Sequence, residues 1–321
     1  MSSSPTVPSA TAATQPFGRG SVALGLHPQT HLNGYQQAEL LVEQGMAAEE
    51  AGFDGVTLSE HHGGFPSYMP QPMLLANWVL GETRRLWAGP GPLLITLRNP
   101  RLVAEEVAWT AAKFPGRVGL VLAPGYVQSD FEAMGEPFAR VQGFEADVSS
   151  MLAALSMDGP LAADAAVAAW AEAKPPVLLA GSSTPSIERA ARLGVGIVFP
   201  GGQNPDRHGR LAQRYRESGG RGPVCGIRVI WVGEPPRTEE AARQDRAYEA
   251  AGAKVDQSER RTTGTVAELV DLLSDWATRS AIDAVNLRIH VAGASRSQIA
   301  DQIAEVGESL VPQLRSMLVV S

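Results

Sequence analysis

The chain reads VALGLHPQTHLNGYQQAELLVEQGMAAEEAGFDGVTLS over residues 22–59. Both ends of this segment, Val22–Leu26 and Gly55–Ser59, are short apolar runs without the polar alternation of a half-exposed strand. Between them, apolar and small residues recur at spacings of three and four, which is the period of an amphipathic helix. Those positions are Ala38, Leu41, Val42, Gly45 and Ala48. The segment therefore predicts a strand–helix–strand unit whose two strands are parallel.

The same alternation continues through the rest of the chain. The eight apolar runs are Val22–Leu26, Gly55–Ser59, Leu86–Gly91, Val118–Ala123, Val177–Ala180, Gly196–Phe199, Gly226–Val232 and Ala284–Ile289. Eight strand-plus-helix units without a linker-like break favour a closed (β/α)8 TIM barrel of the α/β class. An open, doubly wound parallel sheet is the alternative architecture.

Three segments fall outside this regular pattern. Residues 1–18 are expected to form a disordered tail, because the start of the chain is rich in Ser, Thr, Ala and Pro and lacks the apolar core of a signal peptide. Residues 156–176 predict one extra helix. Residues 233–264 form an insertion between the seventh and eighth strands, with a helix through Tyr248, of the kind from which lids are built. The expected domains are thus a tail and one barrel, 19–321.

The composition excludes several classes of partner. The 321 residues include 27 Lys and Arg against 34 Asp and Glu, a formal net charge of −7, and no dense basic run. We therefore expect binding neither to nucleic acid nor to an anionic membrane. No stretch approaches the roughly 18 apolar residues of a membrane span, so a cytoplasmic location is expected. The single cysteine, Cys225, excludes an intrachain disulfide and reads as an inert core thiol.

The densest cluster of reactive side chains follows the second run. In a TIM barrel the chemistry lies where the strands end, and this strand ends in Glu60-His61-His62. A histidine exchanges protons near neutral pH, and a carboxylate beside it orients the ring, so these three are the candidate catalytic residues. A structural network is the alternative. No metal site is predicted, because adjacent strand residues point to opposite faces and no second pair of ligands is evident.

Proline and glycine interrupt the third strand. Pro90 and Pro92 forfeit hydrogen bonds of a parallel sheet, so the backbone bulges or ends here. The Gly91–Pro92 bond is a candidate cis peptide, and such a distortion at a barrel rim leaves room for a flat ligand. An ordinary strand end is the alternative interpretation.

Small residues follow the fourth and fifth strands. The turn Ala123-Pro124-Gly125-Tyr126 ends the fourth, and Ala180-Gly181-Ser182-Ser183 leads from the fifth into a helix near Ser186. Backbone donors and hydroxyls at a helix N-terminus can hold a phosphate, although serines are also ordinary helix caps. We expect Ala123, Gly125, Tyr126, Ala180, Gly181, Ser182, Ser183 and Ser186 to contact a cofactor.

Other motifs are missing, and two histidines remain to be placed. The sequence has no Gly-x-Gly-x-x-Gly opening a helix after a strand, no phosphate-binding loop ending in Gly-Lys-Ser/Thr, and no Gly-x-Ser-x-Gly elbow. His27 ends the first run and His290 the eighth, so both are expected at the mouth of the barrel as either functional or ordinary rim residues. His208 is assigned to a polar loop.

An ordered set of motifs resembles the bacterial luciferase-like flavin-dependent monooxygenases. The matching segments span roughly residues 21–318 and keep barrel-like spacing. They are Gly52-Phe53-Asp54-Gly55-Val56, Glu60-His61-His62, Thr83-Arg84-Arg85-Leu86, Asn99-Pro100, Gly116-Arg117-Val118, Gly125-Tyr126, Asp130-Phe131, Ala180-Gly181-Ser182-Ser183, Arg189-Ala190-Ala191, Gly264-Thr265 and Pro312-Gln313-Leu314-Arg315.

The resemblance implies a TIM barrel that binds reduced FMN and reacts it with oxygen, through a flavin (hydro)peroxide, to oxidise a small organic substrate. It implies that His61 is catalytic, that Gly91–Pro92 underlies the flavin ring, and that Ser182, Ser183 and Ser186 contact the phosphate. An arginine that helps to hold the phosphate in the family is replaced around Ala123-Pro124, so an arginine from elsewhere is one substitute.

The resemblance also carries expectations about partners and surroundings. A separate flavin reductase is expected to supply reduced FMN, since no nicotinamide fingerprint is present. A homodimer is expected through the helices after the second and third strands, which carry Leu75, Trp78, Val79 and Trp109. An apolar pocket is expected from Phe65, Tyr68, Met69, Leu97 and Tyr126. The alternatives are a deazaflavin-dependent hydride transfer and a non-catalytic flavin-binding protein.

Overall fold

The computed structural model describes residues 15–29, 32–201, 204–250 and 261–320. Its strands are β1 Val22–Leu26, β2 Gly55–Leu58, β3 Trp87–Pro90, β4 Leu93–Leu94, β5 Leu120–Ala123, β6 Val177–Ala180, β7 Gly196–Phe199, β8 Val224–Val232, β9 Arg261–Gly264 and β10 Ala284–Arg288. Its α-helices are α1 Gly34–Glu50, α2 Pro72–Glu82, α3 Pro100–Lys113, α4 Gln128–Ala133, α5 Phe144–Ala154, α6 Ala165–Ala173, α7 Thr184–Leu193, α8 Pro205–Glu217, α9 Glu239–Ala250, α11 Val266–Ser280, α12 Arg296–Ser309 and α13 Val311–Val320. Two 3₁₀ turns, η1 Ile95–Leu97 and η2 Phe138–Gly143, complete the elements.

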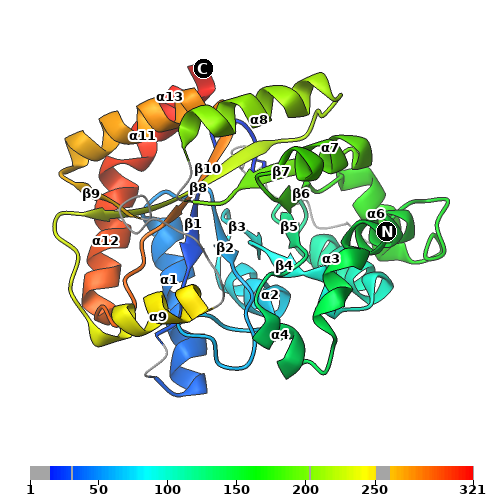
Figure 1. The fold of residues 1–321 in the computed structure, drawn as a ribbon, viewed down its shortest axis with the longest axis horizontal. Coiled ribbons are helices and arrows are strands. Elements are labelled where there is room, and N and C mark those ends of the chain that lie inside the picture. The colour runs from blue at the N-terminus through cyan, green and yellow to red at the C-terminus, as the bar shows by residue number, and fades with distance from the viewer. Residues whose placement is uncertain (1–14, 30–31, 202–203, 251–260, 321) are drawn as a thin grey trace, which may run out of the picture.

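The strands form a nearly closed parallel barrel surrounded by helices (Figure 1). Their order is β3-β2-β1-β10-β8-β7-β6-β5-β4. The two ends of this path meet at an isolated parallel bridge between Ala88 and Val118, where the Ala88 amide donates to the Arg117 carbonyl at 2.9 Å. The predicted α/β barrel is confirmed, and the open-sheet alternative is wrong.

The third predicted strand is split into two. β3 ends at Pro90, β4 resumes at Leu93, and the Gly91–Pro92 peptide between them is cis. Because β3 pairs with β2 while β4 pairs with β5, the two short strands together occupy one position in the barrel wall. The interruption expected from the prolines is therefore present, and it redirects the chain at the carboxyl end of the wall.

Alternate residues of each strand face two separate cores. Val22, Leu24 and Leu26 pack outward against the helices, whereas Ala23 faces the barrel interior. The interior is filled by Phe17, Ala23, Trp87, Val121, Leu178, Val198, Cys225, Ile227 and Ala284. Burial of both faces explains why the runs lack polar alternation. Burial also raises the pKa of the Cys225 thiol, in keeping with an inert core residue.

Part of the predicted tail belongs to the barrel. Residues 1–14 lie outside the described part, but 15–18 lie inside it, and Phe17 is buried. Its ring packs on Trp87 with centroids 4.5 Å apart. A Cβ on Gly119 would lie 2.7 Å from Cε2 of Phe17, so this glycine makes room for the ring. The prediction placed Phe17 in the tail, whereas the structure places its ring in the interior of the barrel.

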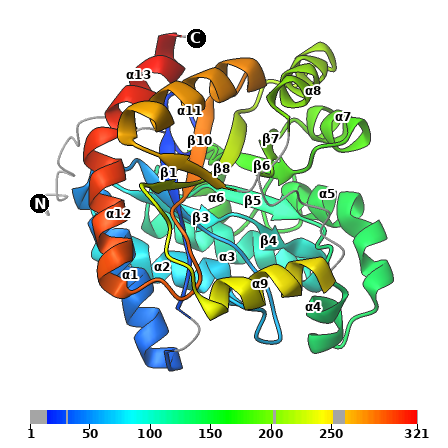
Figure 2. The same ribbon diagram turned by 60° about the vertical axis from the view of Figure 1, so that its left-hand side comes forward.

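The insertion after β8 contains the predicted helix and an additional strand. α9 lies toward the same end of the barrel as α4, which follows β5 (Figure 2). β9 pairs in parallel with β8, from Val229–Arg261 to Val232–Gly264, and extends the sheet beyond the barrel. This strand was not predicted. Residues 251–260 of the insertion lie outside the described residues.

Two further comparisons concern the helices. His208 is buried on α8 with its ring stacked on Phe199, so its assignment to a polar loop is wrong. Helix α6 corresponds to the extra helix predicted within 156–176.

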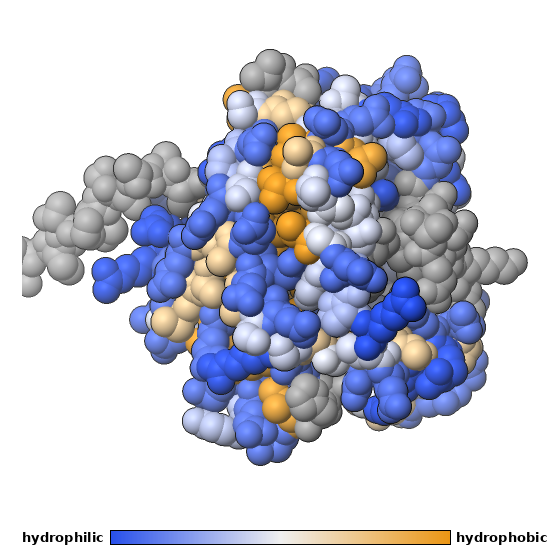
Figure 3. Space-filling view, turned by 90° about the vertical axis from the view of Figure 1, so that its left-hand side faces the viewer, coloured by the Kyte–Doolittle hydropathy of each residue, from blue (hydrophilic) through white to orange (hydrophobic). Residues whose placement is uncertain are grey.

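None of the described helices has the length and apolar character needed to cross a membrane. The face with the C-terminal helices is mainly hydrophilic, with small apolar spots (Figure 3).

Candidate active site

A cavity of about 600 Å³ lies at the carboxyl ends of the strands. Residues that follow β1, β2, β5, β6, β7 and β10 line it, and α9 contributes Gln244, Asp245 and Tyr248. Of the predicted site residues, those in the lining are Glu60, His61, Pro92, Ala123, Gly125, Tyr126, Ala180, Gly181 and Ser182. The ones outside it are His62, Gly91, Ser183 and Ser186. The barrel thus brings most of the predicted set to one cavity.

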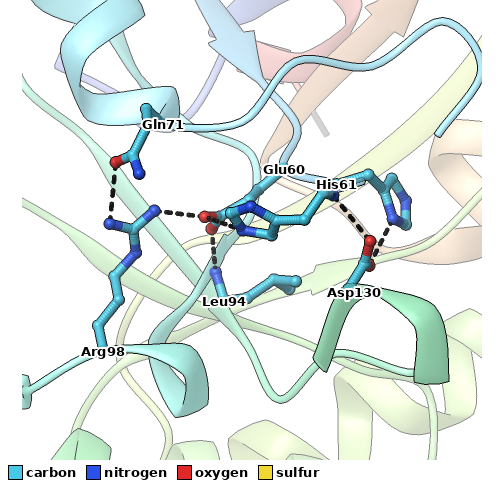
Figure 4. Close-up of polar contacts among 7 residues, drawn as sticks. Glu60, His61, Gln71, Leu94, Arg98 and Asp130 are labelled. Atoms are coloured by element: carbon cyan, nitrogen blue, oxygen red, sulfur yellow. Dashed lines mark hydrogen bonds and ion pairs between the residues drawn. The ribbon is translucent and has the colours of Figure 1, made fainter. Parts of the chain in front are cut away.

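Glu60 is the centre of a buried polar network (Figure 4). One carboxylate oxygen accepts from the Leu94 amide at 2.6 Å. The other contacts Nε2 of His62 at 2.9 Å and forms a short ion pair with Arg98. Since Glu60 is only 2% exposed and both oxygens are occupied, the structural interpretation fits Glu60 and His62 better than a catalytic one.

His61 is oriented by a different carboxylate, that of Asp130 on α4. Nδ1 of His61 lies 2.8 Å from Oδ2 of Asp130, and Oδ1 accepts from the His62 amide at 2.7 Å. Neutral His61 therefore donates its Nδ1 proton to Asp130 and keeps Nε2 as a base. Sequence reasoning expected Glu60 or His62 to orient His61 and missed Asp130. The only signal for it was its place in the motif Asp130-Phe131.

Aromatic rings enclose His61. Its ring stacks on Phe65 at a centroid distance of 4.3 Å and meets the edge of Tyr68 at 4.6 Å. Tyr126 lies 6.0 Å away. Tyr68 in turn forms a short hydroxyl contact with Tyr248 of α9. The expected apolar pocket is thus partly correct, since Tyr68 and Tyr126 line the cavity whereas Phe65, Met69 and Leu97 do not.

Burial has a direct effect on the Tyr248 hydroxyl. It raises the pKa of Tyr248 well above its usual value, and the neighbouring Tyr68 and Tyr126 act in the same direction. Tyr248 therefore stays protonated at neutral pH and can donate a hydrogen bond. Helix α9 thus adds a protonated tyrosine to the lining of the cavity.

The cis peptide lies against a polar corner of the cavity. The Gly91 carbonyl accepts from the Ser59 hydroxyl at 2.7 Å, and Nη2 of Arg288 donates to the same hydroxyl at 3.0 Å. A Cβ on Gly91 would lie 2.6 Å from that of Thr57, so only glycine fits beside β2. Pro92 itself lines the cavity.

The opposite end of the cavity contains the predicted serine turn. Ser182 lines the cavity, whereas Ser183 and Ser186 form a capping box at the start of α7. The alternative interpretation of these two serines as helix caps is therefore correct for their side chains. Nη2 of Arg207, on α8, donates to the Ser182 carbonyl at 3.0 Å. Arg207 is therefore an arginine beside the serine turn, and sequence reasoning did not identify it.

His27 and His290 meet at the mouth, as expected. Their rings stack with centroids 4.3 Å apart and an interplanar angle of 19°. Burial, followed by the charges of His290 and Arg288, holds the pKa of His27 well below its usual value. Over the described residues, no group of three or more His, Cys, Asp or Glu side chains is arranged to hold a metal ion.

Comparison with known proteins identifies the family. A family model described as luciferase-like monooxygenase matches residues 19–313. The chain belongs to the luciferase-like monooxygenase family. The resemblance seen in the ordered motifs is thereby confirmed, and it now rests on nearly the whole barrel.

Curated members of this family align with about half of the chain. A luciferase-like monooxygenase of Escherichia coli (strain K12) is 28% identical over 174 residues, which cover 53% of this chain and 52% of that protein. The N-acetyl-S-alkylcysteine monooxygenase of Bacillus subtilis (strain 168) is 27% identical over 164 residues, 49% of each chain. The chain thus spans about half the length of these curated relatives.

Solved luciferase-like structures share the fold over most of their length. Monooxygenase RslO1 from Streptomyces bottropensis has a TM-score of 0.73 at 17% identity, covering 91% of this chain and 99% of that chain. The oxygenating constituent of 3,6-diketocamphane monooxygenase from Pseudomonas putida, solved with FMN, has a TM-score of 0.72 at 15% identity, with 91% and 98% covered. An F420-dependent secondary alcohol dehydrogenase has a TM-score of 0.67 at 15% identity, with 92% and 98% covered.

Proposed function

We propose that this family member is a flavin-dependent monooxygenase that uses reduced FMN and oxygen to oxidise a small organic substrate. The observation that carries the proposal is the His61–Asp130 pair, which presents a histidine to an aromatic-lined cavity beside the cis Gly91–Pro92 peptide. The structural relatives include enzymes of FMN and of F420, a deazaflavin.

The residues around the cavity fit an FMN molecule. A volume of about 600 Å³ lies in the range of cofactor sites. Arg207, the Ser182 turn and the N-terminus of α7 would hold the phosphate, because they combine a cation with backbone donors. Pro92 and Ala123, which both line the cavity, would contact the ring. When bound, reduced FMN would supply the electrons that activate oxygen.

The protein's own residues would manage protons and water. Asp130 fixes the Nδ1 proton of His61, so Nε2 can accept a proton from a reacting group or return one. Phe65, Tyr68 and Tyr248 exclude water from the space around this nitrogen. Glu60 and His62 position the loop that carries His61 rather than touching the reacting atoms.

Two protein partners belong to the proposal. A separate reductase would supply reduced FMN. A second copy of the chain would cover exposed apolar side chains on α2 and α3, which pack against each other. These side chains are Leu74, Trp78, Leu102 and Trp109. Leu75 and Val79, which were also expected at this surface, are buried in the core instead.

Rapid mixing tests the function against its two rivals. The protein is mixed with reduced FMN or reduced deazaflavin, with and without oxygen, and candidate substrates and products are followed by absorbance and mass spectrometry. Oxygen-dependent product formation with FMN supports the proposal. Oxygen-indifferent hydride transfer with the deazaflavin overturns it in favour of the first rival. Tight flavin retention without turnover supports a non-catalytic flavin-binding protein.

A further inference from the structure

The cavity has a cationic corner that the proposed chemistry does not use. It consists of His27 after β1, Arg288 at the end of β10 and His290 two residues later. β1 and β10 are paired neighbours in the barrel wall, with Leu24 opposite Leu287, so the three side chains come from adjacent strand ends. We call His27, Arg288 and His290 the cationic corner, after the guanidinium of Arg288.

Over the described residues, Arg288 is held by neutral oxygens rather than by a carboxylate. Its Nη2 atom donates to two neutral oxygens, the Ser59 hydroxyl at 3.0 Å and the Gly91 carbonyl at 3.5 Å. Its Nε atom is buried and has no hydrogen-bond acceptor. Arg98, by contrast, is paired with Glu60. A half-buried guanidinium that contacts only neutral groups can still attract an anion in the cavity.

The carboxylates nearest to this chemistry are already occupied. Glu60 accepts from His62, Leu94 and Arg98, and Asp130 accepts from His61 and the His62 amide. Asp245 also lines the same cavity, from α9. Among the described residues, the hydrogen bonds of Arg288 go to neutral oxygens.

The local field around Arg288 is positive. Arg288 and His290 both act with burial to hold the pKa of His27 below its usual value, which shows that the three groups share one poorly solvated space. In such a space an anion gains more from a cation than it does in water. Apolar side chains also line the cavity, among them Val198, Ile227 and Val229.

We propose that the cationic corner binds the carboxylate group of an organic acid substrate, whose apolar remainder extends toward His61. A guanidinium matches a planar carboxylate with paired N–H groups, and Arg288 is the arginine in the lining of this cavity over the described residues. The phosphate of the cofactor would lie at the other end, by Arg207 and Ser182. The inference rests on the proposed function, because it assigns the substrate class of that same site.

Matched pairs of acids and amides test the corner. Titration calorimetry on the full chain, with and without FMN, compares benzoate with benzamide and hexanoate with hexanamide. We expect each acid to bind at least about 10-fold more tightly than its amide, as for loss of one charge-assisted contact. Arg288→Gln should abolish this preference, and Arg288→Lys should retain part of it. Arg210→Gln removes an exposed arginine of α8 and should leave the preference unchanged.

Several outcomes would overturn the inference. Equal binding of acid and amide, or a preference that survives Arg288→Gln, excludes the corner as a carboxylate site. Weaker FMN binding by Arg288→Gln, with the preference unchanged, assigns Arg288 to the flavin instead. If Arg288→Gln fails to fold by circular dichroism, the half-buried His290 is replaced in His290→Gln, which should reduce the preference. Acid preference without any flavin binding would support the corner while overturning the proposed function.

Discussion

His61 and Asp130 are 69 positions apart in the chain, yet their contact decides what His61 can do. The ring is held by Asp130 on one side and by Phe65 and Tyr68 on its faces. This arrangement leaves a single nitrogen for chemistry in a space with little water. A histidine in a capped turn would lack both the fixed tautomer and the dry surroundings.

Asp130→Asn tests this role at the scale of the residue. The asparagine side chain has no negative charge to hold the proton on Nδ1, so His61 is no longer confined to one tautomer. We expect product formation to fall by about 100-fold or more, as for loss of general acid–base catalysis, with FMN affinity nearly unchanged. His61→Ala should cause a similar loss, and the double variant should be little worse than either, because the pair acts as a unit.

Full turnover by Asp130→Asn in a rapid-quench assay would remove the pair from the mechanism. Glu132→Gln, an exposed change two residues along the same helix, is the matched control and should behave as the wild type.

The lowered pKa of His208 leads to a prediction for the pH dependence of the free energy of unfolding. Burial, with the charges of Arg207 and Arg228, lowers its pKa to about 4. The unfolded chain therefore binds a proton near pH 6.5 that the folded chain takes up only near pH 4. The free energy of unfolding is therefore unaffected by His208 above about pH 6.5. It falls by roughly 3 kcal/mol as the pH is lowered from there to 4.

Urea unfolding of the wild type and of His208→Gln at pH 7, 5.5 and 4 measures this loss. The variant should start less stable at pH 7 and lose less on acidification. Some acid loss should remain, because the pKa of His27 is lowered as well. Parallel pH profiles for the two proteins would contradict the assignment.

At the scale of the element, the N-terminal segment acts as a plug for the barrel. Phe17 fills the interior beside Trp87, in the space left by Gly119. Phe17→Ala would leave a cavity that the rigid barrel wall cannot close. We expect the free energy of unfolding to fall by about 3–5 kcal/mol. Chemical denaturation measures it, with the exposed Gln15→Ala as control; a loss below 1 kcal/mol would show that the segment is dispensable.

α9 provides the second test at this scale. Tyr248 reaches from this helix to the Tyr68 hydroxyl and helps to enclose His61. Tyr248→Ala should admit water and lower the yield of product per oxygen consumed, whereas Tyr248→Phe should retain most of the enclosure. Oxygen electrode measurements beside product analysis give this ratio. Equal yields from the alanine variant and the wild type would show that α9 does not exclude water.

At the scale of the whole molecule, the exposed apolar side chains of α2 and α3 predict a dimer. Leu102 and Trp109 are 62% and 57% exposed, which is unusual for large apolar residues on one pair of helices. We expect a dimer by light scattering, and we expect Trp78→Glu together with Leu102→Glu to give a folded monomer. Leu272→Glu, an exposed leucine on α11, is the control; a wild-type monomer at micromolar concentration would contradict the prediction.

The sequence by itself determined the barrel, the position of its strands and the end at which the cavity with Glu60 and His61 lies. This was possible because burial on both faces of a parallel strand, and on one face of a helix, leaves a local pattern such as that of residues 22–59. Prolines and glycines likewise act on the local backbone, so the break of the strand at Gly91–Pro92 could be predicted from the sequence.

Only the tertiary structure decided which side chains meet. Asp130 rather than Glu60 orients His61, Arg207 donates to the Ser182 carbonyl at the serine turn, and Arg288 contacts neutral oxygens among the described residues. No periodic pattern encodes such contacts, since they join loops that are distant in the chain and adjacent only around the closed barrel. The physical reason is that a buried polar group bonds to whichever group the fold places beside it at the mouth of the barrel, and that group need not be near in sequence.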